Sequence, residues 1–139
     1  MNLRLLSWNV RGLNNPRKRQ VCKNLLKEWN CDVVCFQETK VASIDSAFVR
    51  SLWGSPFIDW AALEAVQTSG GVLLVWDKRV FEKMDVIVGQ FSVSVLLRGV
   101  VDDFVWPVLV FMAPMMTVSS LFCGRSCYRC EPGGPWHGV

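Results

Sequence analysis

The fold is decided by a strand–helix–strand pattern near the start of the chain. Residues 3–38 read LRLLSWNVRGLNNPRKRQVCKNLLKEWNCDVVCFQE. The apolar, β-friendly run at residues 3–10 predicts a buried strand, and the short apolar run at residues 32–37 predicts a second one. Gly12 and the Asn-Asn-Pro at 14–16 mark the turn that follows the first strand.

An amphipathic helix is predicted between these two strands. Pro16 suits the first helical position, with Asn15 as its cap, and Asn30 ends the helix. The apolar residues that recur at helical spacing are Val21, Leu25, Leu26 and Trp29, and the polar positions include Arg17, Lys18, Arg19, Lys23 and Lys27. Two strands joined by one helix form a βαβ unit, whose strands lie parallel.

The rest of the first hundred residues is richer in strands than in helices. We predict a second helix over residues 43–53 and further strands at 57–63, 71–76, 81–88 and 91–98, separated by glycine turns. Few helices and many later strands favour a mixed-sheet α/β sandwich over a doubly wound fold.

Composition sets broad limits on the class of protein. The chain has 139 residues, of which 51% are hydrophobic and 19% charged, so it fits one domain with a real core and is not a disordered protein. A net charge of +3 permits a nucleic-acid partner without arguing for one. No secretory signal leads the chain, so we expect an intracellular protein whose Cys22, Cys31 and Cys35 act as small buried hydrophobes.

Two polar residues follow the predicted parallel strands. Asn9 ends the first strand, and Glu38 follows the second. Because functional groups gather at the carboxyl ends of parallel strands, these two side chains are expected at the same end of the sheet. A carboxylate and an amide there suit a hard cation such as Mg²⁺. From spacing alone, a turn residue and a helix-capping acid are the commoner explanation.

The residues themselves add a family resemblance. The stretches LSWNVRG at 6–12, CFQETK at 35–40 and SGGVLLVW at 69–76 resemble the first motifs and the central strand of the endonuclease/exonuclease/phosphatase superfamily. Their wording is most similar to the endonuclease domain of plant LINE-type (non-LTR) retrotransposons. The resemblance covers residues 1–106 and implies a partial, truncated two-layer α/β sandwich that belongs to a metal-dependent DNA endonuclease.

The resemblance also implies roles for individual residues. Glu38 would ligate Mg²⁺, and Asn9 would help to hold the metal and the scissile phosphate, which makes both residues catalytic. The family's general base is a His oriented by an Asp, and its later motifs are Tyr-Gly-Pro, Gly-Asp-Phe-Asn and Ser-Asp-His. None of these motifs occurs here, and His137 has no nearby Asp. We therefore expect little or no hydrolysis.

A DNA partner would be met by basic residues near the same end of the sheet. The candidates are Arg11, Arg17, Lys18 and Arg19. The alternative is a solvated face of the predicted helix, which is how charge runs usually behave.

The last third of the chain, residues 107–139, differs in character. Residues 104–123 form a run without any charged residue. This run is long enough for a transmembrane helix, although two prolines interrupt it. A second explanation is a zinc site, whose ligands would be Cys123, Cys127, Cys130 and His137.

The third explanation, a shifted reading frame, is the one we favour. When the possible codons of residues 107–117 are read from their third bases, they are compatible with Cys-Thr-Gly-Val-Tyr-Gly-Pro-Asn-Asp-Asp, which restores the Tyr-Gly-Pro motif. On this view the tail after about residue 117 is poorly packed, and the chain carries only the first of the family's two sheets, with one apolar face uncovered.

Three functions therefore remain open. The first is a fragment of a retroelement endonuclease with little activity. The second is a non-catalytic module that binds nucleic acid or protein. The third is a small membrane-associated protein that residues 104–123 anchor.

Overall fold

The computed structural model describes residues 4–66, 70–111, 127–130 and 136–138, with backbone alone for residue 111 and the last two ranges. These residues form two helices and nine strands. In chain order the elements are β1 (Leu5–Asn9), α1 (Pro16–Trp29), β2 (Val33–Gln37), α2 (Ser46–Leu52), β3 (Ile58–Leu63), β4 (Val72–Asp77), β5 (Phe81–Val88), β6 (Ser92–Gly99), β7 (Val105–Phe111), β8 (Cys127–Cys130) and β9 (Trp136–Gly138).

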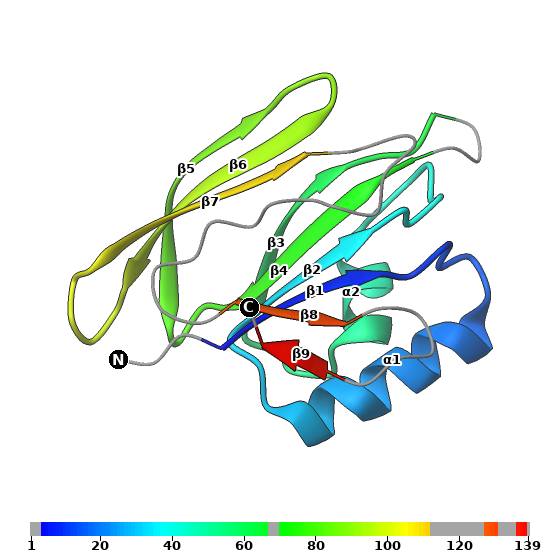
Figure 1. The fold of residues 1–139 in the computed structure, drawn as a ribbon, viewed down its shortest axis with the longest axis horizontal. Helices are drawn as coiled ribbons and strands as arrows, with labels where there is room; N and C mark the ends of the chain where they lie inside the picture. The colour runs from blue at the N-terminus through cyan, green and yellow to red at the C-terminus, as the bar shows by residue number, and fades with distance from the viewer. Residues whose placement is uncertain (1–3, 67–69, 112–126, 131–135, 139) are drawn as a thin grey trace.

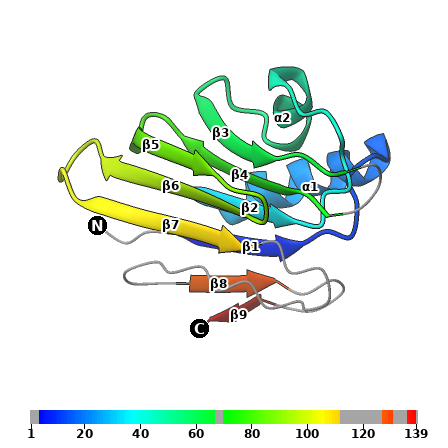
Figure 2. The same ribbon diagram turned by 90° about the horizontal axis from the view of Figure 1, so that it is seen from above.

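The strands form two sheets that pack face to face. The larger sheet has the order β3-β4-β2-β1-β8-β9, and the smaller sheet has the order β5-β6-β7. Strand β1 runs parallel to β2 and to β8, while the other neighbouring pairs are antiparallel. The smaller sheet lies over one face of the larger one, and α1 and α2 lie on the other face (Figures 1 and 2). The predicted α/β sandwich with a βαβ unit is confirmed.

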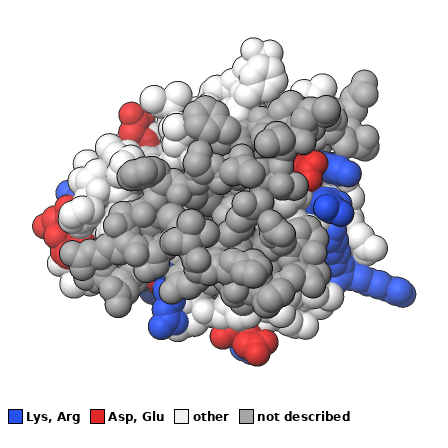
Figure 3. All heavy atoms as spheres, in the orientation of Figure 1, with Lys and Arg blue, Asp and Glu red and all other residues white. Residues whose placement is uncertain are grey.

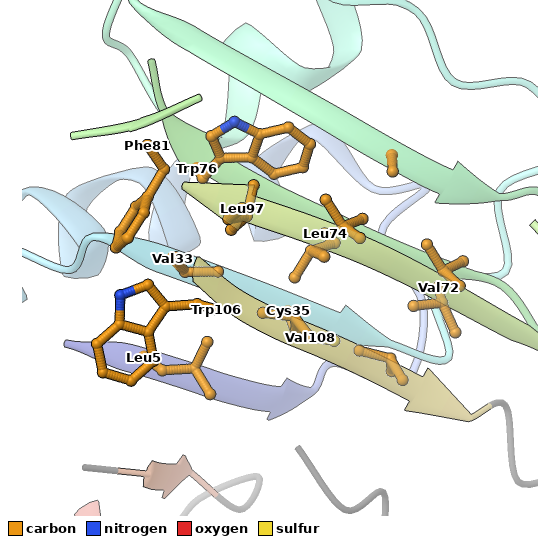
Figure 4. Close-up of a cluster of buried hydrophobic side chains, with 14 residues drawn as sticks. Leu5, Val33, Cys35, Val72, Leu74, Trp76, Phe81, Leu97, Trp106 and Val108 are labelled. Atoms are coloured by element: carbon orange, nitrogen blue, oxygen red, sulfur yellow. The ribbon is translucent and has the colours of Figure 1, made fainter. Parts of the chain in front are cut away.

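Two apolar cores fill the spaces on either side of the larger sheet. Alternate residues of a strand point to opposite faces, so Leu5 belongs to the core between the sheets and Leu6 to the core beneath the helices. All six residues of β4 are buried, as expected for a strand that is covered on both faces. Figure 4 shows the core between the sheets, to which both sheets contribute a tryptophan, Trp76 and Trp106.

The expectation of an uncovered apolar face is wrong. Strands β5, β6 and β7 supply a second layer, and their alternate residues Val93, Val95 and Leu97 point into the core. The strands at 81–88 and 91–98 were predicted but were assigned to a single sheet. The alternation of buried and partly exposed residues in β6 is typical of an antiparallel layer with one solvent face.

Strand β7 crosses the boundary that the sequence suggests at residue 106. Its inward residues Trp106, Val108 and Val110 are buried, whereas Val105 and Pro107 are exposed. Pro107 is tolerated because β7 has a paired neighbour on one side only among the described strands. No strand was predicted here, because the uncharged run hides this two-residue alternation. The poor packing predicted for the tail concerns residues that lie mostly outside the described ranges.

The two alternative explanations of the tail touch the described residues only in part. No helix among these residues is long and apolar enough to cross a membrane, and residues 112–123 lie outside the described ranges. Of the proposed zinc ligands, Cys123 also lies outside them, and the others are described by backbone alone.

Helix α1 has the predicted ends and a slightly different buried face. The Asn15 side chain accepts a hydrogen bond from the Arg17 N–H, and Asn30 ends the helix in a left-handed conformation. Cys22 and Leu26 are the buried residues, whereas Val21 is 55% exposed. Val21 was predicted to face the core, but it lies about 100° around the helix from Cys22. The small Cys22 therefore occupies the contact that Val21 was expected to make.

Two valines of β7 test whether this strand belongs to the core. Val108 is 2% exposed and Val105 is 41% exposed, so a Val-to-Ala change should matter at the first position only. We expect V108A to lower the free energy of unfolding by about 2 kcal/mol and V105A by less than about 1 kcal/mol. Urea denaturation measures both. Equal, negligible effects would show that β7 does not pack against the larger sheet.

Candidate functional site

The two polar residues singled out by the sequence lie at the carboxyl ends of neighbouring parallel strands. Asn9 is in register with Gln37, and Glu38 directly follows β2. Beyond the strands the ladder continues through the backbone. The Val10 N–H donates to the Gln37 carbonyl at 3.0 Å, and the Gly12 N–H donates to the Glu38 carbonyl at 2.7 Å. The structure therefore brings Asn9 and Glu38 to one end of the sheet.

Most of the described residues with a left-handed backbone conformation lie in the connections at this end of the sheet. Positive φ angles occur at Arg11, Gly12, Glu38, Lys40, Gly70 and Gly71. Non-glycine residues rarely adopt this conformation, which costs of order 1–3 kcal/mol each and clusters at functional sites. The backbone around Glu38 is fixed nonetheless, since the Thr39 and Lys40 N–H groups donate to the Gly71 and Gly70 carbonyls at 3.3 and 2.8 Å.

Asn9 has both a structural bond and spare capacity. Residues two apart share a face of a strand, so Asn9 lies on the same side of β1 as Leu5, toward the second sheet. It is 8% exposed, and its Oδ1 accepts a hydrogen bond from the Arg11 N–H at 3.2 Å. This is an Asx-turn, which agrees with the turn-residue alternative. An amide oxygen has two lone pairs, so one remains for another partner.

Glu38 differs from the other acidic side chains of the structure. Among the described residues, every aspartate and Glu64 and Glu82 make a hydrogen bond or an ion pair. Only Glu28 and Glu38 have none, and Glu28 is exposed on the surface of α1. Glu38 is partly buried and directly follows β2. It is therefore the carboxylate that is available to an added cation.

The donor set fits a hard divalent cation sparsely. A carboxylate and an amide oxygen are the ligand types that Mg²⁺ takes, and Mg²⁺ often keeps several waters beside one or two carboxylates. Within the described ranges there is no group of three or more His, Cys, Asp or Glu residues that could enclose a metal ion. The residues present therefore suit a weakly held ion.

The four basic candidates fall into two kinds. Arg11 and Arg17 are exposed, and neither side chain has a partner among the described residues. Lys18 and Arg19 are partly buried and donate to backbone carbonyls of the chain itself. Lys and Arg side chains gather at the end of the molecule where β1 connects to α1 (Figure 3). A positive field at this end suits an anionic ligand.

The three cysteines whose side chains the structure describes, Cys22, Cys31 and Cys35, are weak nucleophiles. Burial raises the pKa of the Cys22 thiol to about 11 and that of the Cys31 thiol to about 12, and it also raises the pKa of Cys35. Cys22 and Cys35 are buried and Cys31 is partly buried, and all three are free thiols. Their predicted role as small hydrophobes is confirmed for Cys22 and Cys35.

Sequence reasoning missed the part that Thr39 and Gly71 play at this end of the sheet. Thr39 is fully buried, and its Oγ1 has no hydrogen-bond partner among the described residues. Gly71 has a φ of 97°, and a Cβ at this position would collide with the Thr39 Oγ1. From the sequence, the Gly70-Gly71 pair is predicted only to form a turn. Its position directly before a buried strand is the feature that could have indicated this contact, because glycine there often marks a close approach of two backbones.

A second charged cluster lies at the opposite end of β2 and has a structural role. Asp77 accepts hydrogen bonds from the Arg79 guanidinium at 2.8 and 3.1 Å, and the guanidinium also lies over the Phe57 ring. Burial raises the pKa of the Asp77 carboxyl, but the bonds from Arg79 outweigh it, and the pKa lies below its usual range. This carboxylate is fully occupied in closing the turn between β4 and β5.

The fold and this site define a class of protein. The chain is a two-sheet α/β sandwich with an oxygen-donor site and exposed cations at the carboxyl ends of its parallel strands. It belongs to the Endonuclease/Exonuclease/phosphatase family, whose model matches residues 6–135. The family accounts for the fold class, and its nucleases generally depend on a divalent metal.

Curated relatives of this chain act on DNA according to their names. The chain is 41% identical over 39 residues to an exodeoxyribonuclease of Bacillus subtilis, a match that covers 28% of this chain and 16% of the relative. It is 40% identical over 45 residues to the DNA-(apurinic or apyrimidinic site) endonuclease 2 of Schizosaccharomyces pombe, covering 28% and 9%. These matches span only a small part of the relatives' length.

Solved structures show the same fold at low identity. The AP endonuclease LMAP of Leishmania major has a TM-score of 0.55 at 15% identity, covering 77% of this chain and 39% of that one. The TDP2 of D. rerio, solved with a single-strand DNA product, has a TM-score of 0.51 at 19% identity, covering 77% and 44%. The APE2 catalytic domain of Xenopus laevis has a TM-score of 0.52 at 14% identity, covering 89% and 46%. The chain spans less than half of each of these structures.

Two glycines test the close approach beside Glu38. In Gly71→Ala the new methyl group meets the Thr39 hydroxyl in a backbone conformation that alanine rarely adopts, so we expect a loss of about 2–3 kcal/mol in the free energy of unfolding. The matched control is Gly54→Ala, whose methyl group meets only the flexible end of Lys23. We expect a change within about 1 kcal/mol there. Thermal denaturation compares the two, and equal effects would contradict a special constraint at Gly71.

Proposed function

We propose that this chain carries the metal-binding part of a DNA endonuclease site that hydrolyses phosphodiester bonds. The observation that carries the proposal is the Glu38 carboxylate, which has no partner among the described residues and lies with Asn9 at the carboxyl ends of β1 and β2. The names of the curated relatives, an exodeoxyribonuclease and a DNA-(apurinic or apyrimidinic site) endonuclease, support DNA as the substrate.

Each residue of the site has a defined part in this proposal. Glu38 and the free lone pair of the Asn9 Oδ1 would hold the divalent cation, which we propose to be Mg²⁺. When bound, the cation neutralises charge on the phosphate oxygens. The exposed Arg11 and Arg17 hold neighbouring phosphates of the DNA backbone, which positions the strand without reading its sequence.

We also propose that these 139 residues cleave DNA slowly or not at all. The family's His and Asp motifs do not occur in the sequence, and a positioned acid–base group contributes about 10²–10⁴-fold to a hydrolysis rate. The chain therefore retains metal and phosphate contacts without a group that activates water. A non-catalytic module that binds nucleic acid is the function that remains if cleavage is absent.

The origin that we propose is a LINE-type retrotransposon of plants, with a shifted reading frame from residue 107. The motifs at residues 6–12 and 35–40 support the origin. Codon compatibility supports the frame shift, since the junctions after Met112, Met115 and Met116 must encode Gly, Asp and Asp when read from their third bases. The buried Val108 and Val110 of β7 show that the first residues after 106 also meet the needs of a strand.

A plasmid assay tests the function. We expect the chain with Mg²⁺ to bind supercoiled plasmid in a gel-shift measurement without nicking it above the background of Glu38→Gln, which keeps the shape of the side chain but removes its charge. Arg11→Gln should weaken binding and reduce its salt dependence by about one phosphate contact. Nicking that Glu38→Gln abolishes would overturn the proposed inactivity, and absence of DNA binding would overturn the proposed substrate.

The nucleotide sequence tests the frame shift sharply. The alternate frame encodes Cys-Thr-Gly-Val-Tyr-Gly-Pro-Asn only if seven codons of residues 107–114 each have one particular third base. The expected third bases are T for Pro107, A for Val108, G for Leu109, G for Val110, T for Phe111, C for Ala113 and A for Pro114. Sequencing the coding DNA checks all seven positions at once. Several mismatches would refute the frame shift and restore residues 107–139 as an ordinary part of the fold.

A further inference from the structure

The connection between β1 and α1 is held from both sides. Its N–H groups face β2, where those of Gly12 and Leu13 donate to the Glu38 and Thr39 carbonyls at 2.7 and 2.8 Å. Its carbonyl groups face the first turns of α1. Two basic side chains of that helix, Lys18 and Arg19, reach back to these carbonyls.

The bonds from the helix cover four of the carbonyls in this connection. The Lys18 Nζ donates to the Val10 carbonyl and, at 3.4 Å, to the Arg11 carbonyl. The Arg19 Nη1 donates to the Leu13 and Asn14 carbonyls at 2.8 and 3.0 Å. Hydrogen bonds from a charged donor contribute more than those between neutral groups. Lys18 thus fixes the backbone directly after Asn9, including the left-handed Arg11.

Arg19 also contacts residues in the interior of the protein. Its guanidinium carbon lies 5.1 Å from the centre of the Phe48 ring in α2, and its Nε is buried without an acceptor in the part of the chain that the structure describes. The side chain therefore joins three elements, namely the connection after β1, helix α1 and helix α2. A phosphate that bound the Nη1 of this guanidinium would have to displace its two carbonyl bonds.

The dipole of α1 does not favour basic residues in its first turn. The first turn of α1 has no acidic residue, and Arg17, Lys18 and Arg19 stand near the end of the helix where its dipole is positive. Cations are unfavourable there. The carbonyl bonds of Lys18 and Arg19 offset this cost, whereas Arg17 is exposed and has no such bond to any described residue.

We infer that Lys18 and Arg19 are positioning residues that hold the β1–α1 connection, and with it Asn9 and Arg11, in the geometry of the site, while Arg11 and Arg17 face the ligand. The inference rests on the proposed function for its consequence at the metal. Its structural part depends on hydrogen bonds alone. We call the bonds from Lys18 and Arg19 to the carbonyls of the β1–α1 connection the clamp.

Amide hydrogen exchange tests the clamp without any ligand. The probes are the Gly12 and Leu13 amides, and the Val93 and Val95 amides of β6 serve as internal references. We expect Lys18→Met and Arg19→Met to reduce protection at the probes by on the order of tenfold and to leave the references unchanged. Arg17→Met is the matched control and should leave both sets unchanged. Unchanged probe amides in Lys18→Met and Arg19→Met would overturn the inference.

A charge-conserving substitution separates a clamp from a phosphate contact. Arg19→Lys keeps the positive charge but loses the planar group that reaches two carbonyls and stacks on Phe48. We expect exchange as fast as in Arg19→Met. Restored protection in Arg19→Lys would show that charge alone matters and would overturn the role of the planar group.

Metal affinity tests whether the clamp serves the site. Terbium luminescence sensitised by tryptophan reports a hard cation bound to the folded chain. We expect Lys18→Met to weaken terbium binding by on the order of tenfold and Lys27→Met, at an exposed basic position in the last turn of α1, to leave it unchanged. Normal affinity in Lys18→Met would overturn the positioning role. Absence of terbium binding in the unmodified chain would overturn the proposed function instead, and the exchange data would then decide the clamp.

Discussion

The parallel register of β1 and β2 is the constraint on which the rest of the structure depends. It places Asn9 opposite Gln37, and the next hydrogen bonds of the ladder carry the pairing into both connections beyond the strands. Because β4 pairs antiparallel with β2, its first residues meet the same end, and Gly71 enters the site from the other side. A shift of one residue in this register would turn Asn9 away from the space between the sheets.

The register persists because the larger sheet is buried on both faces. Leu5 and Cys35 contact the second sheet, and Leu6 and Phe36 contact the helices, so a slipped strand would move matched side chains into the wrong core. Burial on both sides also supports the left-handed residues at the sheet end, since strained backbone persists only where its surroundings fix it. The second sheet is therefore part of what makes the site rigid.

Most helices and strands could be predicted from the sequence. Which of the two sheets each strand joins could not. Caps and periodicity located α1 to the residue, because Asn15, Pro16 and Asn30 act locally. The second layer was missed, since which face a strand buries depends on partners far away in the chain. The same limit applies to the site. The motifs singled out Asn9 and Glu38, but the clamp by Lys18 and the close approach of Thr39 to Gly71 are tertiary contacts that leave no periodic signal.

The contrast between the two ends of β2 shows why Glu38 is the residue to which a function is assigned. At the amino end, Asp32 accepts a hydrogen bond from the Arg4 N–H and Asp77 is paired with Arg79, so both carboxylates are occupied within the protein. At the carboxyl end, Glu38 is partly buried and has no such bond among the described residues. Glu38 is therefore the carboxylate of this sheet that an added cation can take as a ligand. The weak binding expected of such an ion would follow from a single carboxylate.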